Sequence, residues 1–201
     1  TLHNSTVTYN TAGTYDVTLT VTNANGNSAL TKNNYIVVNP LPPAPLAPSP
    51  PAYCQGDVIG DLTATGSGGT LTWYGNALLT NQLGTGSPFS SGTTSNASYW
   101  VTETLNGCEG PATKVDITLN GLPDATIQPP YGPYCENDTL QDLSAASAGG
   151  TWSGTGITDT AQGIFDPSTG TGTYSITYSV TDAKGCSNAD TVNVTVKDLP
   201  D

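Results

Sequence analysis

The chain repeats itself, and this internal repeat limits what it can fold into more than any other feature. Residues 13–26, GTYDVTLTVTNANG, match residues 172–185, GTYSITYSVTDAKG, without a gap. A second pair of segments also matches, because Tyr53-Cys54 and Tyr134-Cys135 are each followed by an aspartate three residues after the cysteine. Similarity at a period of about 80 residues indicates tandem modules rather than one continuous domain.

A short seam follows the last alternating segment of each module, reading NPLPP at 39–43, NGLPD at 120–124 and KDLPD at 197–201. We therefore divide the chain into residues 1–39, 40–122 and 123–201. About 40 residues supply too few strands for a sandwich, so residues 1–39 are expected to be the C-terminal half of a module, truncated or completed by other segments. Residues 39–51 hold seven prolines among 13 residues, which predicts an extended, semi-rigid linker.

Apolar and polar residues alternate along 15–22 and again along 174–181, as in strands with one buried face. Asn25-Gly26, Asn106-Gly107 and Lys184-Gly185 fall between such runs, and Asn-Gly is typical of tight hairpins. Short strands with frequent turn signals predict an all-β fold in which each complete module is a two-sheet sandwich. The predicted architecture is a tandem array of β-sandwich modules joined by Pro-rich linkers.

The four cysteines are Cys54, Cys108, Cys135 and Cys186, one near the first strand and one after a late turn in each complete module. Three pairings exist, and the repeat favours the two within modules, Cys54–Cys108 and Cys135–Cys186. Each would close a loop of about 50 residues and contribute roughly 3–4 kcal/mol. A four-thiolate zinc site would need closely spaced cysteine pairs, which this chain lacks. Disulfides predict a location outside the cytoplasm.

These residues carry a resemblance to known repeat families. Residues 9–26 resemble the C-terminal half of a PKD (polycystic kidney disease) domain, although Asn27 stands where the other modules have cysteine. The middle module resembles bacterial Ig-like repeats of large surface proteins of Bacteroidota, and the third resembles PKD-like repeats of gliding-associated, type IX-secreted proteins. The motifs are 53–57, 71–74 and 102–109 in the middle module, and 149–154, 165–167 and 172–186 in the third. The resemblance implies a secreted, cell-surface protein whose modules act as spacers, stalks or appendages to enzymes.

Residues for catalysis are scarce, so we expect no enzymatic activity and no cofactor. The single histidine, His3, lies near a terminus, where a solvated side chain is expected. Most carboxylates are single aspartates in Thr- and Gly-rich turns, where the side chain usually caps the backbone. Aspartate pairs repeat between modules and are weak candidates for calcium, with turn capping as the alternative interpretation. These candidates are Asp57, Asp61, Asp138 and Asp142.

Large aromatic side chains raise the question of sugar binding. Trp73 and Trp152 are expected in the cores of their modules, Trp73 against a disulfide, as in immunoglobulin sandwiches. Tyr99 and Trp100 are neighbours on one strand and must point to opposite faces. Trp100 is therefore a candidate for contact with a sugar or with a neighbouring module.

Three Asp-Thr-apolar triplets are similar to the sites at which Bacteroidota O-glycosylate exported proteins. Their threonines, the candidate glycosylation sites, are Thr139, Thr160 and Thr191.

Charge and hydropathy exclude two classes of partner. The chain has 4 Lys+Arg against 16 Asp+Glu, a formal net charge of −12, so it has no basic face for nucleic acid. No apolar run approaches the roughly 20 residues that span a bilayer. The expected partners are neighbouring modules of the same long chain, identical chains in a fibre, and glycans.

Two functions follow from these observations. The first is a non-enzymatic structural repeat region of an extracellular adhesin stalk or surface fibre. The alternative is a carbohydrate-binding accessory region of a secreted polysaccharide-degrading enzyme, for which an open aromatic platform around Trp100 would be the mark.

Overall fold

Strands and turns make up the fold, as the alternating pattern predicted. The computed structural model describes residues 6–199, and the one helical segment in that range is a single 3₁₀ turn, η1 (Pro167–Thr169). No helix among these residues is long and apolar enough to cross a membrane. The chain forms two compact units, Thr1–Pro51 with Ile59–Ile117, and Ala52–Val58 with Thr118–Asp201. These units do not coincide with the modules 1–39, 40–122 and 123–201, whose boundaries stay a prediction.

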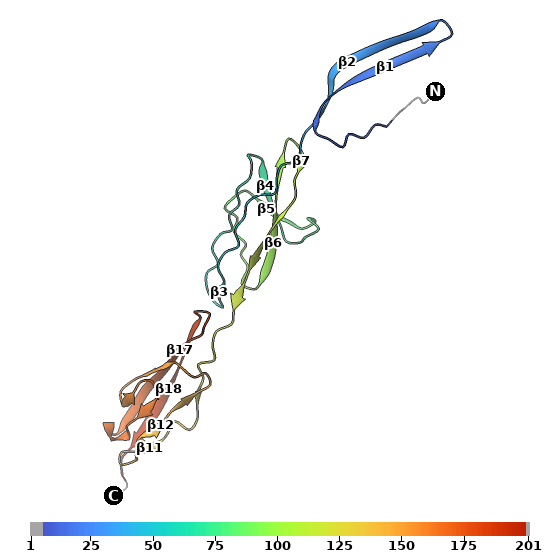
Figure 1. The fold of residues 1–201 in the computed structure, drawn as a ribbon. Helices are drawn as coiled ribbons and strands as arrows, with labels where there is room; N and C mark the ends of the chain where they lie inside the picture. The colour runs from blue at the N-terminus through green and yellow to red at the C-terminus, as the bar shows by residue number, and fades with distance from the viewer. Residues whose placement is uncertain (1–5, 200–201) are drawn as a thin grey trace. The chain divides into compact units, whose positions relative to one another are not determined.

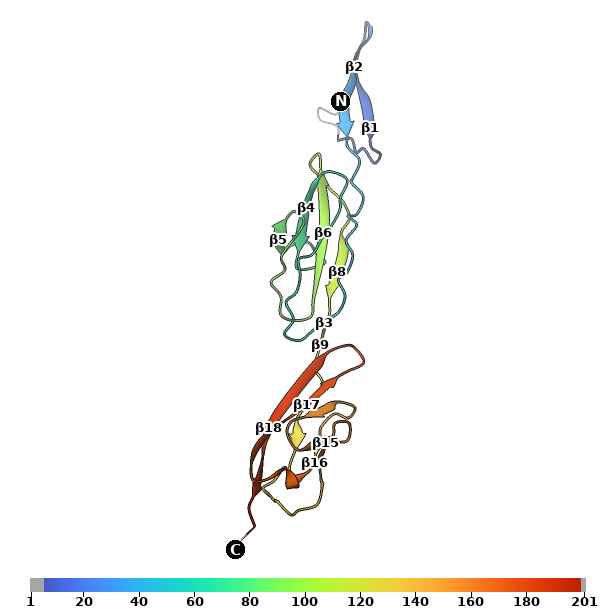
Figure 2. The ribbon, with the colours of Figure 1, turned by 90° about the vertical axis from the view of Figure 1, so that its left-hand side faces the viewer.

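The N-terminal unit contains one isolated hairpin and one five-stranded sheet. In the sheet, β6 pairs with β4, β7 and β8, and β5 pairs with the far edge of β4 (Figure 2). The strands of this unit are β1 (Gly13–Asn23), β2 (Gly26–Val38), β4 (Thr70–Tyr74), β5 (Gln82–Thr85), β6 (Ala97–Leu105), β7 (Cys108–Glu109) and β8 (Thr113–Ile117).

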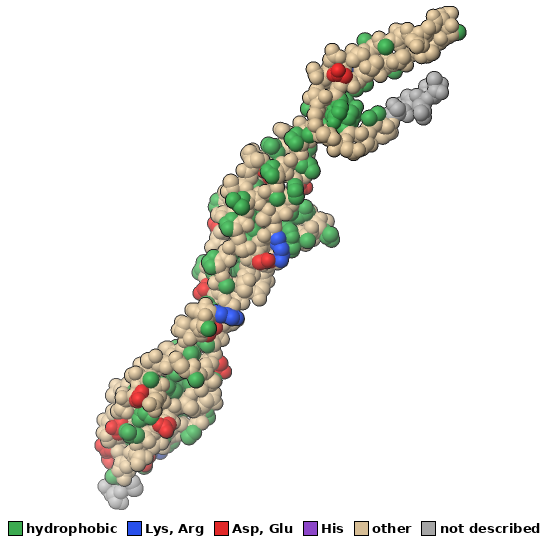
Figure 3. All heavy atoms as spheres, in the orientation of Figure 1, with side chains coloured by type: hydrophobic (Ala, Val, Ile, Leu, Met, Phe, Trp, Pro, Cys, Tyr) green, Lys and Arg blue, Asp and Glu red, His purple; other side chains and the backbone are tan. Residues whose placement is uncertain are grey.

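The hairpin of β1 and β2 leaves apolar side chains in solvent. Within the described residues these two strands pair only with each other (Figure 1). Leu19 and Val21 are 64% and 58% exposed, whereas the residues that match them in the repeat, Tyr178 and Val180, are 2% and 6% exposed. Hydrophobic side chains accordingly stand on the surface of the hairpin (Figure 3). The same alternating pattern therefore packs against a core in residues 172–181 but is exposed to solvent in residues 13–23.

The core of the five-stranded sheet is built from the inward residues of β4, β6 and β8. Trp73 is fully buried, stacks on Phe89 at a ring-centroid distance of 5.1 Å, and donates from Nε1 to the Gly86 carbonyl oxygen at 2.8 Å. The prediction that Trp73 fills the core is confirmed. Its other buried apolar members are Leu62, Ala64, Tyr99, Val101, Val115 and Ile117.

The Pro-rich segment is extended, but it lies against the folded unit rather than acting as a free linker. Pro42 and Pro45 are buried, and the Thr113 hydroxyl donates to the Pro45 carbonyl oxygen. Leu46 forms a two-way backbone bridge with Thr65 at 2.8 Å. The part of the expected linker around residues 42–46 therefore packs against the unit, where Leu46 and Thr65 form an isolated bridge.

The C-terminal unit is a sandwich closed by several short strands. A four-stranded sheet in the order β11-β18-β17-β14 accompanies a three-stranded sheet, β12-β16-β15, and the pairs β10–β13 and β3–β9. The strands are β3 (Tyr53–Cys54), β9 (Leu119–Asn120), β10 (Ile127–Gln128), β11 (Tyr134–Cys135), β12 (Gln141–Asp142), β13 (Ser144–Ala145), β14 (Thr151–Ser153), β15 (Ile157–Asp159), β16 (Ile164–Phe165), β17 (Gly172–Thr181) and β18 (Ser187–Lys197).

One contiguous core holds this sandwich together. Trp152 is 3% exposed and its ring lies 4.7 Å from that of Tyr178, so its predicted place in the core is confirmed. Phe165 and Ile176 are fully buried beside them. Ala125 and Ile127 belong to the same core, so the residues after the seam at 120–124 also lie against the sandwich instead of forming a linker.

The hairpin turns agree only in part with the sequence prediction. Asn106 and Gly107 both have positive φ, 52° and 78°, and they form the two-residue turn expected between β6 and β7. Between β1 and β2 the turn is one residue earlier, because Gly26 already pairs with Asn23. Residues 182–186 form a longer loop between β17 and β18, since Thr181 pairs with Ser187.

Candidate functional site

The structure corrects the predicted disulfide pairing. Cys54 is bonded to Cys186, 132 residues away in sequence, with a Cα–Cα distance of 5.5 Å. Cys108 and Cys135 are free thiols, each half-buried. Both predicted bonds, Cys54–Cys108 and Cys135–Cys186, are therefore wrong, and Trp73 has no disulfide of its own module to pack against.

Strand direction explains why the two cysteines of the third module cannot meet. Cys135 pairs with Lys197 at the last residue of β18, whereas Cys186 directly precedes the first residue, Ser187. The 11 residues of β18 span roughly 35 Å. Figure 1 shows β11 and the tip of the β17–β18 hairpin at opposite ends of this unit. A disulfide requires Cα atoms within about 7 Å, so this pair cannot form.

Cys54 and Cys108 belong to different compact units of the chain. Cys108 pairs with Leu105 at one end of β6. Asn120, the register partner of Cys54, lies in the other unit. In both modules the first cysteine is thus tied to the end of the last strand, and the second follows a hairpin turn.

A tight turn positions Cys54 for its bond. The Cys54 amide donates to Asp57 Oδ2 at 2.7 Å, and the Asp57 amide donates back to the Cys54 carbonyl oxygen at 3.0 Å. The Gln55 amide then donates to the Asn120 carbonyl oxygen at 2.8 Å, which fastens the turn to β9. The carboxylate of Asp57 is therefore used to cap its own turn.

Asp138 caps the turn after Cys135 in the same way, with the Cys135 amide 2.7 Å from its Oδ2. The turn-capping interpretation of Asp57 and Asp138 is thus what the structure shows. Among residues 6–199 no three His, Cys, Asp or Glu side chains come together as a metal ion would need. Calcium binding by these residues and by Asp61 and Asp142 has no support in this geometry.

The loop that carries Cys186, between β17 and β18, is also held by hydrogen bonds. The amides of Lys184 and Cys186 both donate to Asp182 Oδ1 at 2.9 Å, and the Asp182 amide donates to the Cys186 carbonyl oxygen at 2.9 Å. Cys186 is fully buried. The loop therefore holds its cysteine in a fixed position that is shielded from solvent.

Trp100 lies on the outward face of its sheet and is half-buried, while its neighbour Tyr99 is buried, so the predicted division between faces is confirmed. Lys114 Nζ stands 6.0 Å from the centroid of the Trp100 ring, and it also forms an ion pair with Asp116 at 2.8 Å. The side-chain hydrogen bonds from Lys114 and Ser98 lower the pKa of Asp116. Sugar binding by Trp100 stays a prediction.

Sequence reasoning missed a buried carboxylate in β6. Glu103 is fully buried and accepts hydrogen bonds from the Ser67 amide and hydroxyl, both at 2.8 Å, and from the Gly69 amide. These bonds, first that from the Ser67 amide, lower the pKa of Glu103. A Cβ at Gly69 would collide with the Thr104 carbonyl oxygen, so glycine is required for this close approach. The available signal was a charge at an inward position of an alternating strand.

The third module holds the equivalent loop by different chemistry. Its Gly150 amide donates to the Tyr178 hydroxyl at 2.8 Å, and this hydroxyl donates to the Ser147 carbonyl oxygen at 2.6 Å. Tyr178 pairs with Trp152 as Glu103 pairs with Leu71, one residue after the repeated Gly-Gly-Thr. The two side chains therefore occupy the same position in the repeat.

We expect Glu103→Gln to lower the Tm of the N-terminal unit at pH 7 by roughly 5 °C or more, because a neutral amide binds the loop amides less strongly. A carboxyl group whose pKa is lowered by folding stabilises the fold above its ordinary pKa of 4.5, and this stabilisation is lost as the pH falls through the folded-state value. The variant should therefore lose less Tm than the parent chain between pH 7 and pH 3. Calorimetry checks this, with Glu136→Gln in the other unit as control; equal acid sensitivity of parent and Glu103→Gln would contradict it.

The three candidate glycosylation sites are exposed. Thr139 lies in a loop, Thr160 in a turn, and Thr191 in β18, where its hydroxyl lies 2.9 Å from that of Thr177. Exposure is compatible with modification, and glycosylation at these threonines stays a prediction. His3 lies outside the described residues.

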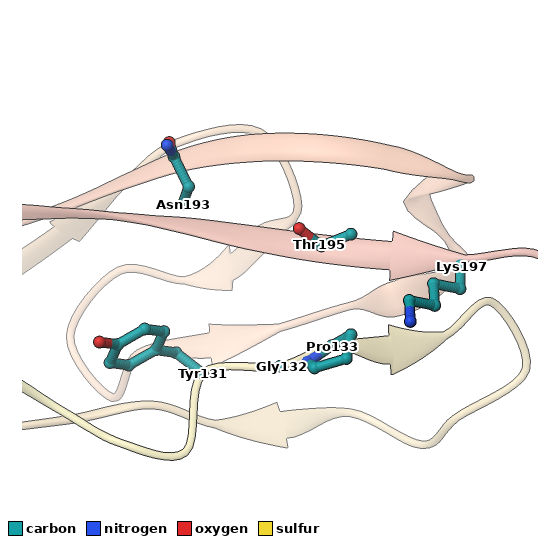
Figure 4. Close-up of a pocket in the computed structure, with 6 residues that line it drawn as sticks. All are labelled: Tyr131, Gly132, Pro133, Asn193, Thr195 and Lys197. Atoms are coloured by element: carbon teal, nitrogen blue, oxygen red, sulfur yellow. The ribbon is translucent and has the colours of Figure 1, made fainter.

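A shallow pocket of about 300 Å³ adjoins the free Cys135 strand (Figure 4). Lys197, the register partner of Cys135, supplies its one charged lining group. The other lining groups are hydroxyl, amide and ring groups, and the lining holds no carboxylate or imidazole. Its lining residues are Tyr131, Gly132, Pro133, Asn193, Thr195 and Lys197.

Comparison with known families gives two matches along this all-β chain. The model of an Ig-like domain, described as CHU_C associated, matches residues 42–120, and that of the PKD domain matches residues 2–36. Both are non-catalytic domain types, and such repeats are typical of surface proteins. The resemblance seen in residues 9–26 and in the middle module is thereby supported at the level of the domain family.

Solved structures with detectable similarity include two protocadherin fragments. Human mucin-like protocadherin EC1-2 is 11% identical, with 78% of this chain and 98% of that chain covered and a TM-score of 0.31. Mouse protocadherin-24 EC1-3 is 12% identical, with 92% and 79% covered and a TM-score of 0.30. These scores are too low to carry an argument. No curated protein matches the sequence.

Proposed function

We propose that this chain is a non-enzymatic, load-bearing repeat segment of an extracellular stalk or surface fibre. The observation that carries the proposal is the Cys54–Cys186 bond, which joins the first cysteine motif of one repeat to the hairpin of the next. Such a bond strengthens the link between consecutive repeats against tension. A stalk needs this strength, whereas a catalytic site does not.

Three further features support this role. A disulfide persists in oxidising surroundings, which agrees with a location outside the cell. The repeats resemble those of large surface and type IX-secreted proteins of Bacteroidota, and the matched Ig-like family is described as CHU_C associated. A net charge of −12 makes neighbouring stalks repel one another, which opposes non-specific aggregation.

An antibody against residues 40–199 is expected to label intact cells that produce the parent protein. The epitopes of an extracellular stalk are accessible without permeabilisation, so the signal should be equal before and after detergent treatment. Electron microscopy of gold-labelled cells would place the label on material outside the envelope. Label that appears only after permeabilisation would contradict the proposal; an antibody against a cytoplasmic protein serves as the control for envelope integrity.

A further inference from the structure

The free cysteine Cys135 sits in the same local structure as the bonded Cys54. Each lies at the end of a two-residue strand parallel to the last strand of its module, β11 beside β18 and β3 beside β9. Each donates its amide to the carboxylate of the aspartate three residues later, at 2.7 Å in both cases. The residue after each cysteine donates to the last strand, at 2.8 Å in the first case and 3.1 Å in the second.

The surroundings of Cys54 and Cys135 differ in the cysteine that each can bond. Cys54 meets the cysteine of a β-hairpin, Cys186, that belongs to the next module along the chain. Cys135 cannot use Cys186, because the length of β18 separates them. The seam that leads from β9 toward Cys186, Leu122-Pro123-Asp124, has its counterpart after β18 in Leu199-Pro200-Asp201.

We propose that Cys135 is a site for bonding the hairpin cysteine of a module of the same kind, when such a module is joined after Asp201. One disulfide would then join each pair of successive repeats, with the first cysteine of every module linked forward and the hairpin cysteine linked backward. This inference deepens the proposed stalk function by naming the partner of the C-terminal module.

The bond requires an oxidant, and glutathione disulfide can supply it. The Cys135 thiolate attacks this disulfide and releases one glutathione thiol, and the hairpin thiolate then displaces the second. Two electrons pass to glutathione disulfide and two protons leave the protein thiols as the new S–S bond forms.

A lengthened chain tests the proposal. Residues 125–201 are appended after Asp201, which takes the seam position of Asp124, and the appended copy carries Cys135→Ser so that it offers only its hairpin cysteine. The protein is refolded with glutathione redox buffer, alkylated with maleimide and weighed. The present chain should show two free thiols, those of Cys108 and Cys135. The lengthened chain should show one, and a digest without reductant should contain the Cys135 peptide linked to a Cys186 peptide.

The matched control has Cys186→Ser in the appended copy as well. Here the Cys135 link should vanish and two free thiols should return. The Cys54–Cys186 link in the same digests reports that the original modules have folded. The proposal is overturned if Cys135 stays free in the lengthened chain while that link has formed, or if Cys135 joins two chains into a reducible dimer. Because the assay measures bonding alone, its failure would leave the cell-labelling result untouched.

Discussion

Pulled by its two ends with the disulfide intact, the chain is expected to reach a length of only about 250 Å at full extension, against about 700 Å after reduction. The bond joins residues 132 apart, so the force passes from Cys54 through sulfur to Cys186 and bypasses everything between them. Only roughly 70 residues remain to be stretched, at about 3.5 Å each. Single-molecule force spectroscopy with handles at both termini measures this difference directly.

Two variants make the measurement specific. Cys54→Ser should give the full length even without reductant, whereas Cys108→Ser, which removes a free thiol, should leave the short length unchanged. Equal lengths for the parent chain and Cys54→Ser would show that the bond does not carry the load. The expected result also means that the sheet around β6 is protected from tension by a bond outside its own core.

Replacing Trp73 by alanine is expected to destabilise the N-terminal unit by about 3–5 kcal/mol. The ring is fully buried, stacks on Phe89 and bonds the Gly86 carbonyl oxygen, so its loss leaves both a cavity and an unpaired acceptor. Domains have total stabilities of roughly 5–15 kcal/mol, so this loss would be a large fraction of the stability of the unit.

Calorimetry should show the Tm of this unit falling by more than about 10 °C in Trp73→Ala. Trp100→Ala is the matched control, because Trp100 lies on the neighbouring strand of the same sheet but faces outward and is only half-buried. If both variants lower the Tm equally, the assignment of Trp73 to the core as the decisive anchor is wrong.

The strands and the core positions could be predicted because both depend on local alternation. The run around Leu19 and its match around Tyr178 each specify one apolar face, and Trp73 and Trp152 lie in cores where large rings were expected. What alternation does not specify is whether another sheet covers that face. The exposed Leu19 and buried Tyr178 differ in tertiary surroundings, not in pattern.

The prediction of the cysteine pairing was wrong because it did not account for strand direction. The sequence prediction paired Cys135 with Cys186 because both lie in the same repeat. It assumed that cysteines of one repeat are also close in space. The parallel pairing of β11 with the far end of β18 was invisible to it, because a two-residue strand has no periodic signal. Glu103 was missed for a similar reason, since its partners lie in a loop 34 to 36 residues earlier in the chain.

The long span between Cys54 and Cys186 has a consequence for oxidative folding. In an unfolded chain the shorter loops, above all that from Cys108 to Cys135, close at a smaller entropic cost than the loop from Cys54 to Cys186, so oxidation before folding favours mispaired bonds. Formation of β18 places Cys135 and Cys186 at opposite ends of one strand, and Cys54 and Cys186 are the pair that is bonded in the folded chain. We therefore expect the native crosslink to form after β18 has formed rather than before it.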